Sequence, residues 1–245
     1  MTAPVPTRAM VLAAGLGSRM GALTEDRPKP LIRVGGRALI DHALDRLQAV
    51  GVGDVVVNLF YLADHIRDHL AGRSAPATQY SEETERLETG GGVTNALGLL
   101  GDEAFYVVNA DAFWLNGSMD ALGRLAASWD DETMDGLLLL HSTVDAYGYD
   151  GRGDFLCAAD GRLTRRPESE VAPWLFTGIQ ILHPRLFRDA PEGAFSLNLL
   201  YDRALEAERL FGVVHDGEWF HVGTPEGLDE AETYLGERFA ETKHR

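Results

Sequence analysis

A glycine-rich segment near the N-terminus has the residue types and spacing to hold a phosphate. Residues 12–20 read Leu-Ala-Ala-Gly-Leu-Gly-Ser-Arg-Met and follow an apolar run. The two glycines let backbone N–H groups approach a phosphate closely, and Arg19 adds a forked cation. The segment is not a Walker loop, because no Gly-Lys-Ser/Thr follows, and Met20 stands where a dinucleotide-binding pattern has its third glycine. The alternative interpretation is a tight turn from strand to helix.

Lysine is rare in this chain. Of the 22 basic residues only Lys29 and Lys243 are lysines, and Lys243 belongs to the charged C-terminal tail. A lysine presents a compact charge on a flexible stem, which suits a phosphate that moves during a reaction. Lys29, which stands between two prolines, is therefore either a phosphate ligand or a lysine on the surface.

Asp111 is a third residue that could take part in chemistry, because it follows a strand predicted at 105–109. The carboxyl ends of strands form the edge at which ligands bind in open α/β sheets. A carboxylate beside a triphosphate suits Mg²⁺, which prefers oxygen ligands and keeps several waters. The alternative role for Asp111 is to cap the following helix.

Apolar periodicity predicts the elements that position these residues. In the first half, strands and helices alternate, with strands at 8–14, 54–60 and 105–109 and helices at 38–50, 62–70 and 94–100. This alternation indicates a parallel sheet that is covered on both faces. The second half is less regular, with strands at 136–141, 174–182, 213–214 and 219–222, a hairpin at 154–164 and a helix at 197–209. Thr224 and Pro225 are expected to open the last helix.

Composition limits the class of protein. The chain has 245 residues, of which 45% are hydrophobic and 24% charged, enough for a full core in a single domain over 1–245. No apolar run approaches the ~20 residues that cross a bilayer, and residues 1–8 lack a secretory signal pattern, so we expect a cytoplasmic protein. The single cysteine excludes an internal disulfide. The net charge of −16 excludes nucleic acid as an expected partner and requires local cations for an anionic substrate.

Several motifs together resemble the signature of the sugar-1-phosphate nucleotidyltransferases. In chain order they are Gly15-x-Gly17-x-Arg19-Met20, Arg27-Pro28-Lys29-Pro30-Leu31, Val34-Gly35-Gly36, Leu87-Glu88-Thr89-Gly90-Gly91-Gly92, Val108-Asn109-Ala110-Asp111 and Phe220-His221-Val222-Gly223-Thr224. The resemblance implies an α/β, Rossmann-like (GT-A-type) fold with a mixed, mainly parallel sheet flanked by helices and a small sugar-binding lobe. It also implies a nucleotide-binding part at about 1–115 and a sugar-binding part at about 116–245.

The resemblance also implies an activity, in which a sugar 1-phosphate attacks the α-phosphorus of a nucleoside triphosphate and releases pyrophosphate. Residues 151–155 and 176–178 look most like the members that act on UTP and N-acetyl-α-muramate 1-phosphate in cell-wall sugar recycling. Such a protein would be a monomer or a small homo-oligomer. Two rival hypotheses remain: a mannose- or glucose-1-phosphate enzyme using GTP or UTP, and a catalytically silent nucleotide- or sugar-binding regulator.

Specific roles come from the same resemblance. Arg19 would hold the β and γ phosphates, Lys29 the α-phosphoryl charge, and Asp111 a Mg²⁺ ion, with Mn²⁺ as an alternative metal. The residues that would contact the nucleotide are Leu12, Ala13, Ala14, Gly15, Gly17, Ser18, Glu88, Thr89 and Gly90. The glycine run that begins with Gly90 is also expected to open a helix and to offer free N–H groups.

The resemblance implies sugar contacts as well. They are Gly153, Asp154, Glu168 or Glu170, Thr177, Gly178 and Asn198. The lactyl carboxylate of N-acetylmuramate calls for a cation, and three arginines are candidates for it, although each could equally be a solvated surface residue: Arg152, Arg165 and Arg166.

His221 departs from the family pattern, because members of the family typically carry a metal-binding aspartate before Val-Gly-Thr. Imidazole suits Mn²⁺, Co²⁺ or Zn²⁺ better than Mg²⁺. His221 could therefore ligate the metal through a ring nitrogen, or hold a metal-bound water or a phosphate by a hydrogen bond. In the third interpretation the substitution leaves a binding protein without activity.

Overall fold

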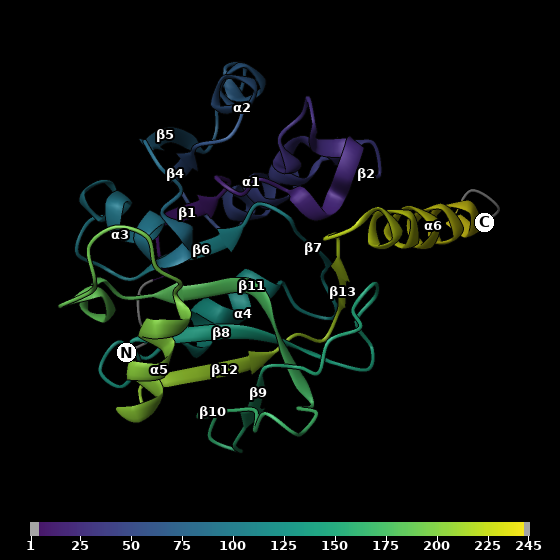
Figure 1. Ribbon diagram of the computed structural model, residues 1–245. Coiled ribbons are helices and arrows are strands. Elements are labelled where there is room, and N and C mark those ends of the chain that lie inside the picture. The colour runs from purple at the N-terminus through teal and green to yellow at the C-terminus, as the bar shows by residue number, and fades with distance from the viewer. Residues whose placement is uncertain (1–4, 243–245) are drawn as a thin grey trace.

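The computed structural model describes residues 5–242, and Lys243 lies outside them (Figure 1). Within these residues a nine-stranded sheet is built around four parallel strands. They are β1 (Arg8–Leu12), β4 (Asp54–Leu59), β5 (Ala77–Glu82) and β6 (Phe105–Asn109). Their order across the sheet is β5-β4-β1-β6.

The second half of the chain extends the same sheet. β11 (Trp174–Leu182) runs antiparallel to β6, and β8 (Gly136–Ser142) pairs antiparallel with β11 and parallel with β12 (Leu210–Val214). A hairpin of β9 (Phe155–Cys157) and β10 (Leu163–Arg165) continues from the start of β11. The predicted fold class is confirmed, since β11 and β10 run against the other strands of a mainly parallel sheet.

Helices cover both faces of the sheet. α1 (Leu39–Ala49), α2 (Ala63–Leu70) and α4 (Ala121–Ser128) pack in one apolar core. α3 (Glu88–Leu100) and α5 (Asn198–Glu206) pack in the other, together with the 3₁₀ helix η3 (Pro184–Phe187). Because successive side chains of a strand point to opposite faces, Val11 contributes to the first core and Met10 to the second.

A smaller substructure stands beside the sheet. β7 (Ala112–Leu115) pairs antiparallel with β13 (Glu218–His221), and α6 (Pro225–Thr242) projects at the side of the molecule (Figure 1). Two short 3₁₀ helices, η1 (Ser18–Thr24) and η2 (Lys29–Leu31), lie near the hairpin of β2 (Arg33–Val34) and β3 (Arg37–Ala38). A separate apolar cluster joins η1, the β7–β13 ribbon and α6. No helix among residues 5–242 is long and apolar enough to cross a membrane.

Several predicted boundaries were wrong. α3 begins at Glu88, not at 94, because its glycines are buried against other segments and tertiary packing outweighs their low helix propensity. β5 was not predicted, since its sequence Ala-Thr-Gln-Tyr-Ser-Glu has no apolar alternation, and β7 and α4 were also missed. The Thr224 cap of α6 is confirmed, because its hydroxyl oxygen accepts the Gly227 N–H at 3.2 Å.

Candidate nucleotide-binding site

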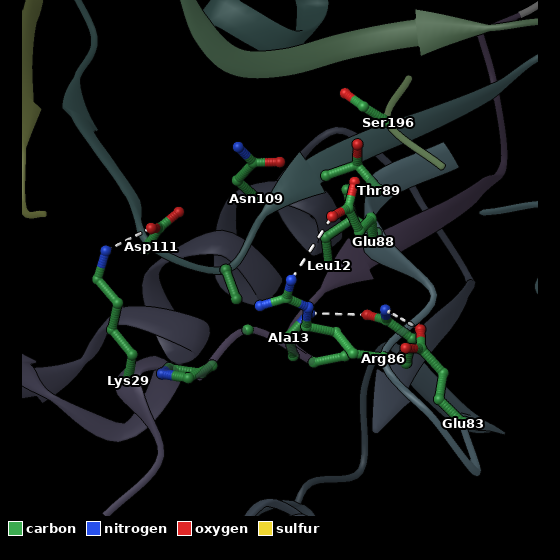
Figure 2. A pocket seen from close by; sticks show the side chains of 15 residues that line it. Leu12, Ala13, Lys29, Glu83, Arg86, Glu88, Thr89, Asn109, Asp111 and Ser196 are labelled. Atoms are coloured by element: carbon green, nitrogen blue, oxygen red, sulfur yellow. Dashed lines mark hydrogen bonds and ion pairs between the residues drawn. The ribbon is translucent and has the colours of Figure 1, made fainter. Parts of the chain in front are cut away.

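A pocket of about 340 Å³ lies where the carboxyl ends of the parallel strands meet the start of α3 (Figure 2). This is the edge at which ligands bind in open α/β sheets. The structure brings together at this pocket eight residues that the sequence predicted for the nucleotide, its phosphates or a metal. They are Leu12, Ala13, Ala14, Gly15, Lys29, Glu88, Thr89 and Asp111.

Gly17 does not line the pocket, but it fixes the position of Lys29. Its backbone has a positive φ of 67°, which favours glycine. A Cβ atom at Gly17 would stand 3.0 Å from the Lys29 Cβ and from the Thr24 side chain. The Gly17 carbonyl accepts hydrogen bonds from the Met20 N–H and the Thr24 hydroxyl. The glycine therefore allows the loop to pack directly on the stem of Lys29.

Gly90 also lies outside the pocket lining, and the prediction of free N–H groups in its glycine run is wrong. The N–H groups of Gly90 and Gly91 both donate to the Phe195 carbonyl, at 2.8 and 3.1 Å. A Cβ atom at Gly90 would collide with the Phe195 ring. These glycines let α3 pack against the segment before α5, which holds the neighbouring Thr89 at the pocket.

Lys29 and Asp111 form the polar end of the pocket (Figure 2). Lys29 is only 8% exposed, and its Nζ lies 2.5 Å from the Asp111 Oδ2. The Asp111 side chain is 38% exposed, so the pair is open to a ligand on the side of the carboxylate. Arg19 and Ser18 are exposed in η1, and within residues 5–242 the Arg19 guanidinium has no hydrogen bond or ion pair. Its charge is available to an anion.

His221 stands beside these groups. In the β7–β13 ribbon it pairs with Ala112, the residue after Asp111. Its ring folds over Gly223, where a Cβ atom would collide with it. Burial lowers the pKa of His221, the positive charges of Arg19 and Lys29 lower it further, and Asp111 opposes the shift. The imidazole is therefore neutral near pH 7, which leaves a ring nitrogen able to accept a hydrogen bond or bind a metal.

A buried hydrogen-bond network forms the floor of the pocket (Figure 2). The Ala13 N–H donates to the Asn58 Oδ1 at 2.7 Å, and the Asn58 Nδ2 donates to the Glu83 Oε1 at 2.6 Å. The Leu87 N–H donates to the Glu83 Oε2 at 3.1 Å. Sequence reasoning missed Asn58 and Glu83. The sequence offered a clue to Asn58, which is a polar residue at the end of a buried strand. It offered none to Glu83, which follows a strand that was not predicted.

The predicted sugar-side residues lie outside this pocket and bind parts of the protein itself. The Thr177 hydroxyl is buried and donates to the Leu139 carbonyl at 2.8 Å. The Asp154 Oδ2 accepts the Phe176 N–H at 2.8 Å, and the Gly153 N–H donates to the Tyr149 hydroxyl. The Asp154 bond holds the loop between β8 and β9 against the start of β11, the Gly153 bond closes that loop on itself, and the Thr177 bond joins β11 to β8.

Other residues predicted to contact the sugar also lie outside the pocket lining. Gly178 has a φ of 82° at an irregularity of β11, and a Cβ atom there would stand 2.7 Å from the Asn109 side-chain nitrogen. Asn109 lines the pocket, so Gly178 shapes its wall from behind. Glu168 and Glu170 are exposed, and their backbone carbonyls accept hydrogen bonds from Arg166.

The three candidate arginines differ in what they bind. Arg165 donates to Asp202 at 2.8 Å and to Asn198, and it lies over the Phe155 ring. Arg166 donates to four backbone carbonyls, those of Gly153, Pro167, Glu168 and Glu170. The Arg152 guanidinium is exposed and has no hydrogen bond or ion pair within residues 5–242.

The chain is similar in sequence to known proteins. Residues 9–169 match the model of the MobA-like NTP transferase domain. The chain belongs to this family. It is 44% identical to the N-acetylmuramate alpha-1-phosphate uridylyltransferase of Caulobacter vibrioides, over 95% of this chain and 98% of that protein. It is 35% identical to the protein of the same name from Neisseria meningitidis serogroup B, over 94% and 98% of the two chains. The resemblance of the motifs to the sugar-1-phosphate nucleotidyltransferases is confirmed.

Solved structures show the same fold. HddC from Yersinia pseudotuberculosis, complexed with GMP-PN, matches with a TM-score of 0.74 at 22% identity, over 93% of this chain and 99% of that one. A UDP-glucose pyrophosphorylase complexed with UDP-glucose matches with a TM-score of 0.77 at 17% identity, over 94% and 98%. At these identities the likeness concerns the fold alone.

The donor set of this NTP transferase fits a loosely held divalent cation. Within the described residues no group of three or more His, Cys, Asp or Glu side chains could hold a metal ion. Asp111 offers a half-exposed carboxylate and His221 a neutral imidazole beside it. A cation bound here would take its remaining ligands from water and substrate phosphates, which is how Mg²⁺ is usually bound.

Proposed function

We propose that this protein transfers a uridylyl group from UTP to N-acetyl-α-muramate 1-phosphate, giving UDP-N-acetylmuramate and pyrophosphate. Two relatives named for this activity match the chain over nearly the full length of both partners. The structural observation that carries the proposal is the Lys29–Asp111 pair at the polar end of the pocket. The step would belong to the recycling of cell-wall sugars.

The proposed mechanism depends on charge and position. An oxygen of the sugar phosphate attacks the α-phosphorus, a new P–O bond forms, and the bond to the bridging oxygen breaks as pyrophosphate leaves. Both reactants are anions, so positioning and charge neutralisation supply most of the catalysis. Lys29 would stabilise the charge on the α-phosphoryl group, and Arg19 would hold the outer phosphates. No nucleophilic side chain is required.

We propose that Asp111 holds Mg²⁺, or Mn²⁺ in its place, with His221 at the side of the ion. When bound, the cation would neutralise phosphate charge. The ion pair with Asp111 holds the Lys29 ammonium group in the pocket, where it would face the α-phosphate.

Pyrophosphate release over a panel of substrates tests the proposal. The panel pairs UTP and GTP with the 1-phosphates of N-acetylmuramate, N-acetylglucosamine, glucose and mannose. We expect the highest kcat/KM with UTP and N-acetyl-α-muramate 1-phosphate. Turnover of mannose 1-phosphate with GTP, but not of the muramate sugar, would replace this assignment by the first rival.

The second rival, a silent binding protein, needs a separate measurement. Calorimetry reports whether UTP binds, and the pyrophosphate assay with Mg²⁺ and with Mn²⁺ reports whether it reacts. We expect binding and turnover. Binding of UTP without pyrophosphate from any sugar phosphate would favour the regulator.

A further inference from the structure

Glu83 is a buried carboxylate without a cationic partner. It is 8% exposed, it lines the pocket, and within residues 5–242 it forms no ion pair. Its two oxygens accept hydrogen bonds from the Asn58 side chain and the Leu87 N–H instead. Burying a carboxylate is costly unless hydrogen bonds compensate for the lost water. The surroundings of Glu83 are therefore built to hold this group in place.

Asn58 is the residue that connects Glu83 to the other side of the pocket floor. It is 2% exposed, and its Oδ1 accepts the Ala13 N–H while its Nδ2 donates to Glu83. A carboxamide presents an acceptor and a donor on one planar group, whereas a carboxylate presents acceptors only. The asparagine thus links the end of β1 to the end of β5, and Glu83 continues the link to Leu87.

Helix α3 lies directly on this pair. A Cβ atom at Gly92 would stand 2.9 Å from the Glu83 Oε1 and 3.0 Å from the Asn58 Nδ2. Glu88 and Thr89, which begin α3, line the same pocket as Ala13. The hydrogen bonds of Asn58 and Glu83 therefore set the separation between two walls of the pocket.

We propose that Asn58 and Glu83 are positioning residues for the nucleotide, which hold the end of β1 and the start of α3 at the separation that UTP requires. The inference rests on the proposed function, because it concerns the same pocket. Both residues act through the backbone of Ala13 and Leu87 and not on the reacting phosphates. Their substitution changes nucleotide affinity more than it changes kcat.

A reciprocal exchange of the two functional groups tests the inference. Asn58→Asp alone places two carboxylates against each other, and Glu83→Gln alone leaves one donor of the network without an acceptor. In the double variant Asn58→Asp/Glu83→Gln, the carboxylate at position 58 accepts from Ala13 and from the new amide. The carbonyl oxygen of that amide accepts from Leu87. The double variant keeps the net charge of the wild type and restores the pattern of hydrogen bonds.

Calorimetry with UTP and steady-state kinetics give the readouts. Each single substitution should raise the Kd of UTP about tenfold or more, the scale expected for an unpaired buried polar group. The Kd of the double variant should return to within about threefold of the wild-type value. The KM of the sugar phosphate and kcat at saturating UTP should change less than the Kd. Circular dichroism before each titration ensures that only folded protein is compared.

Asn95→Asp provides the matched control. Asn95 also lies on α3 and donates to the Ser81 hydroxyl and the Glu82 carbonyl, but it does not line the pocket. Its Kd for UTP should stay at the wild-type value. If the double variant binds UTP as weakly as Glu83→Gln alone, the carboxylate acts on the ligand itself. If the single variants bind UTP with the wild-type Kd, the pair has no positioning role. Failure of the wild type to bind UTP would overturn the proposed function together with this inference.

Discussion

The candidate nucleotide pocket and the region predicted to contact the sugar use their polar groups in different ways. The Arg19 guanidinium, in η1 outside the residues that line the pocket, has no protein partner within residues 5–242, and the Asp111 side chain in the pocket is 38% exposed. In the second region, the polar atoms of Thr177 in β11, and of Asp154 and Arg166 beside the β9–β10 hairpin, already bind carbonyls and N–H groups of the backbone. The first region holds charge ready for a ligand, whereas the second uses these three residues to keep a shape and leaves the exposed Arg152 guanidinium without a partner within residues 5–242.

This difference shows that the sequence motifs contain two kinds of residue. Some bind other parts of the protein, and others are free to bind a ligand. Buried polar groups must find partners within the protein, so a buried motif residue acts mainly through the backbone it holds. Exposed groups without partners can exchange water for substrate. Lys29 combines both properties, because it is 8% exposed and paired with Asp111, whose side chain is 38% exposed at the pocket. Gly17 never lines the pocket, and yet its conformation allows the loop to pack on the stem of Lys29.

Removing the lysine of the pocket should have the largest effect. We expect Lys29→Ala to lower kcat by about 10²–10³, since preorganised charge at the phosphoryl group supplies much of the catalysis. Pyrophosphate release at saturating substrates measures the loss. Arg27→Ala, a neighbouring exposed arginine outside the pocket lining, serves as the control. A wild-type rate for Lys29→Ala would contradict the assigned site.

Gly17→Ala should have the next largest effect, although it removes no polar group. Its Cβ atom would press on the stem of Lys29, and its positive φ would be strained. We expect kcat/KM to fall about tenfold and the free energy of unfolding to fall by about 1–2 kcal/mol. Gly51→Ala, just after α1, is the control, because Gly51 also has a positive φ but no atom within 4 Å of an added Cβ. Equal losses of activity in the two variants would remove the proposed link to Lys29.

Arg166→Lys should affect the sugar side alone. A lysine cannot reproduce the fork that binds four backbone carbonyls, so the loop at 167–170 would lose its anchor. We expect the KM of the sugar phosphate to rise about tenfold, the scale of losing hydrogen bonds from a charged group, with the KM of UTP unchanged. Arg162→Lys, in an exposed pair with Asp160, is the control. A rise in the KM of UTP would show that the two regions are coupled.

The smallest expected effect is a decrease in the free energy of unfolding at acid pH. Burial lowers the pKa of His183, and the charge of Arg185 lowers it further, so the folded protein binds fewer protons here than the unfolded chain. The stability that this contributes is complete above the ordinary pKa of 6.5 and declines as the pH falls below it. Urea unfolding at pH 7.5 and 5.5 should show the decline. In His183→Asn, position 183 can still accept the Arg185 N–H, and the free energy of unfolding should fall less between pH 7.5 and 5.5. A fall as large as in the wild type would contradict the assignment of the effect to His183.

The motifs and periodicity of the sequence determined the class of fold and the principal pocket residues. Apolar runs predicted β1, β4, β6 and β11 because burial on both faces of a sheet requires them. The position of Asp111 after β6 predicted its place at the ligand edge, where the structure shows it. Lys29 stood out because lysine is otherwise almost absent from the chain.

Only the tertiary structure decided which polar groups remain for a ligand. The N–H groups of Gly90 and Gly91 are occupied by Phe195, a residue far away in the sequence. Asn58 and Glu83 meet because β4 and β5 are neighbours in the sheet, and His221 reaches Asp111 through the pairing of β13 with β7. Local sequence patterns report burial and conformation, whereas hydrogen-bond partners depend on which distant segments pack together.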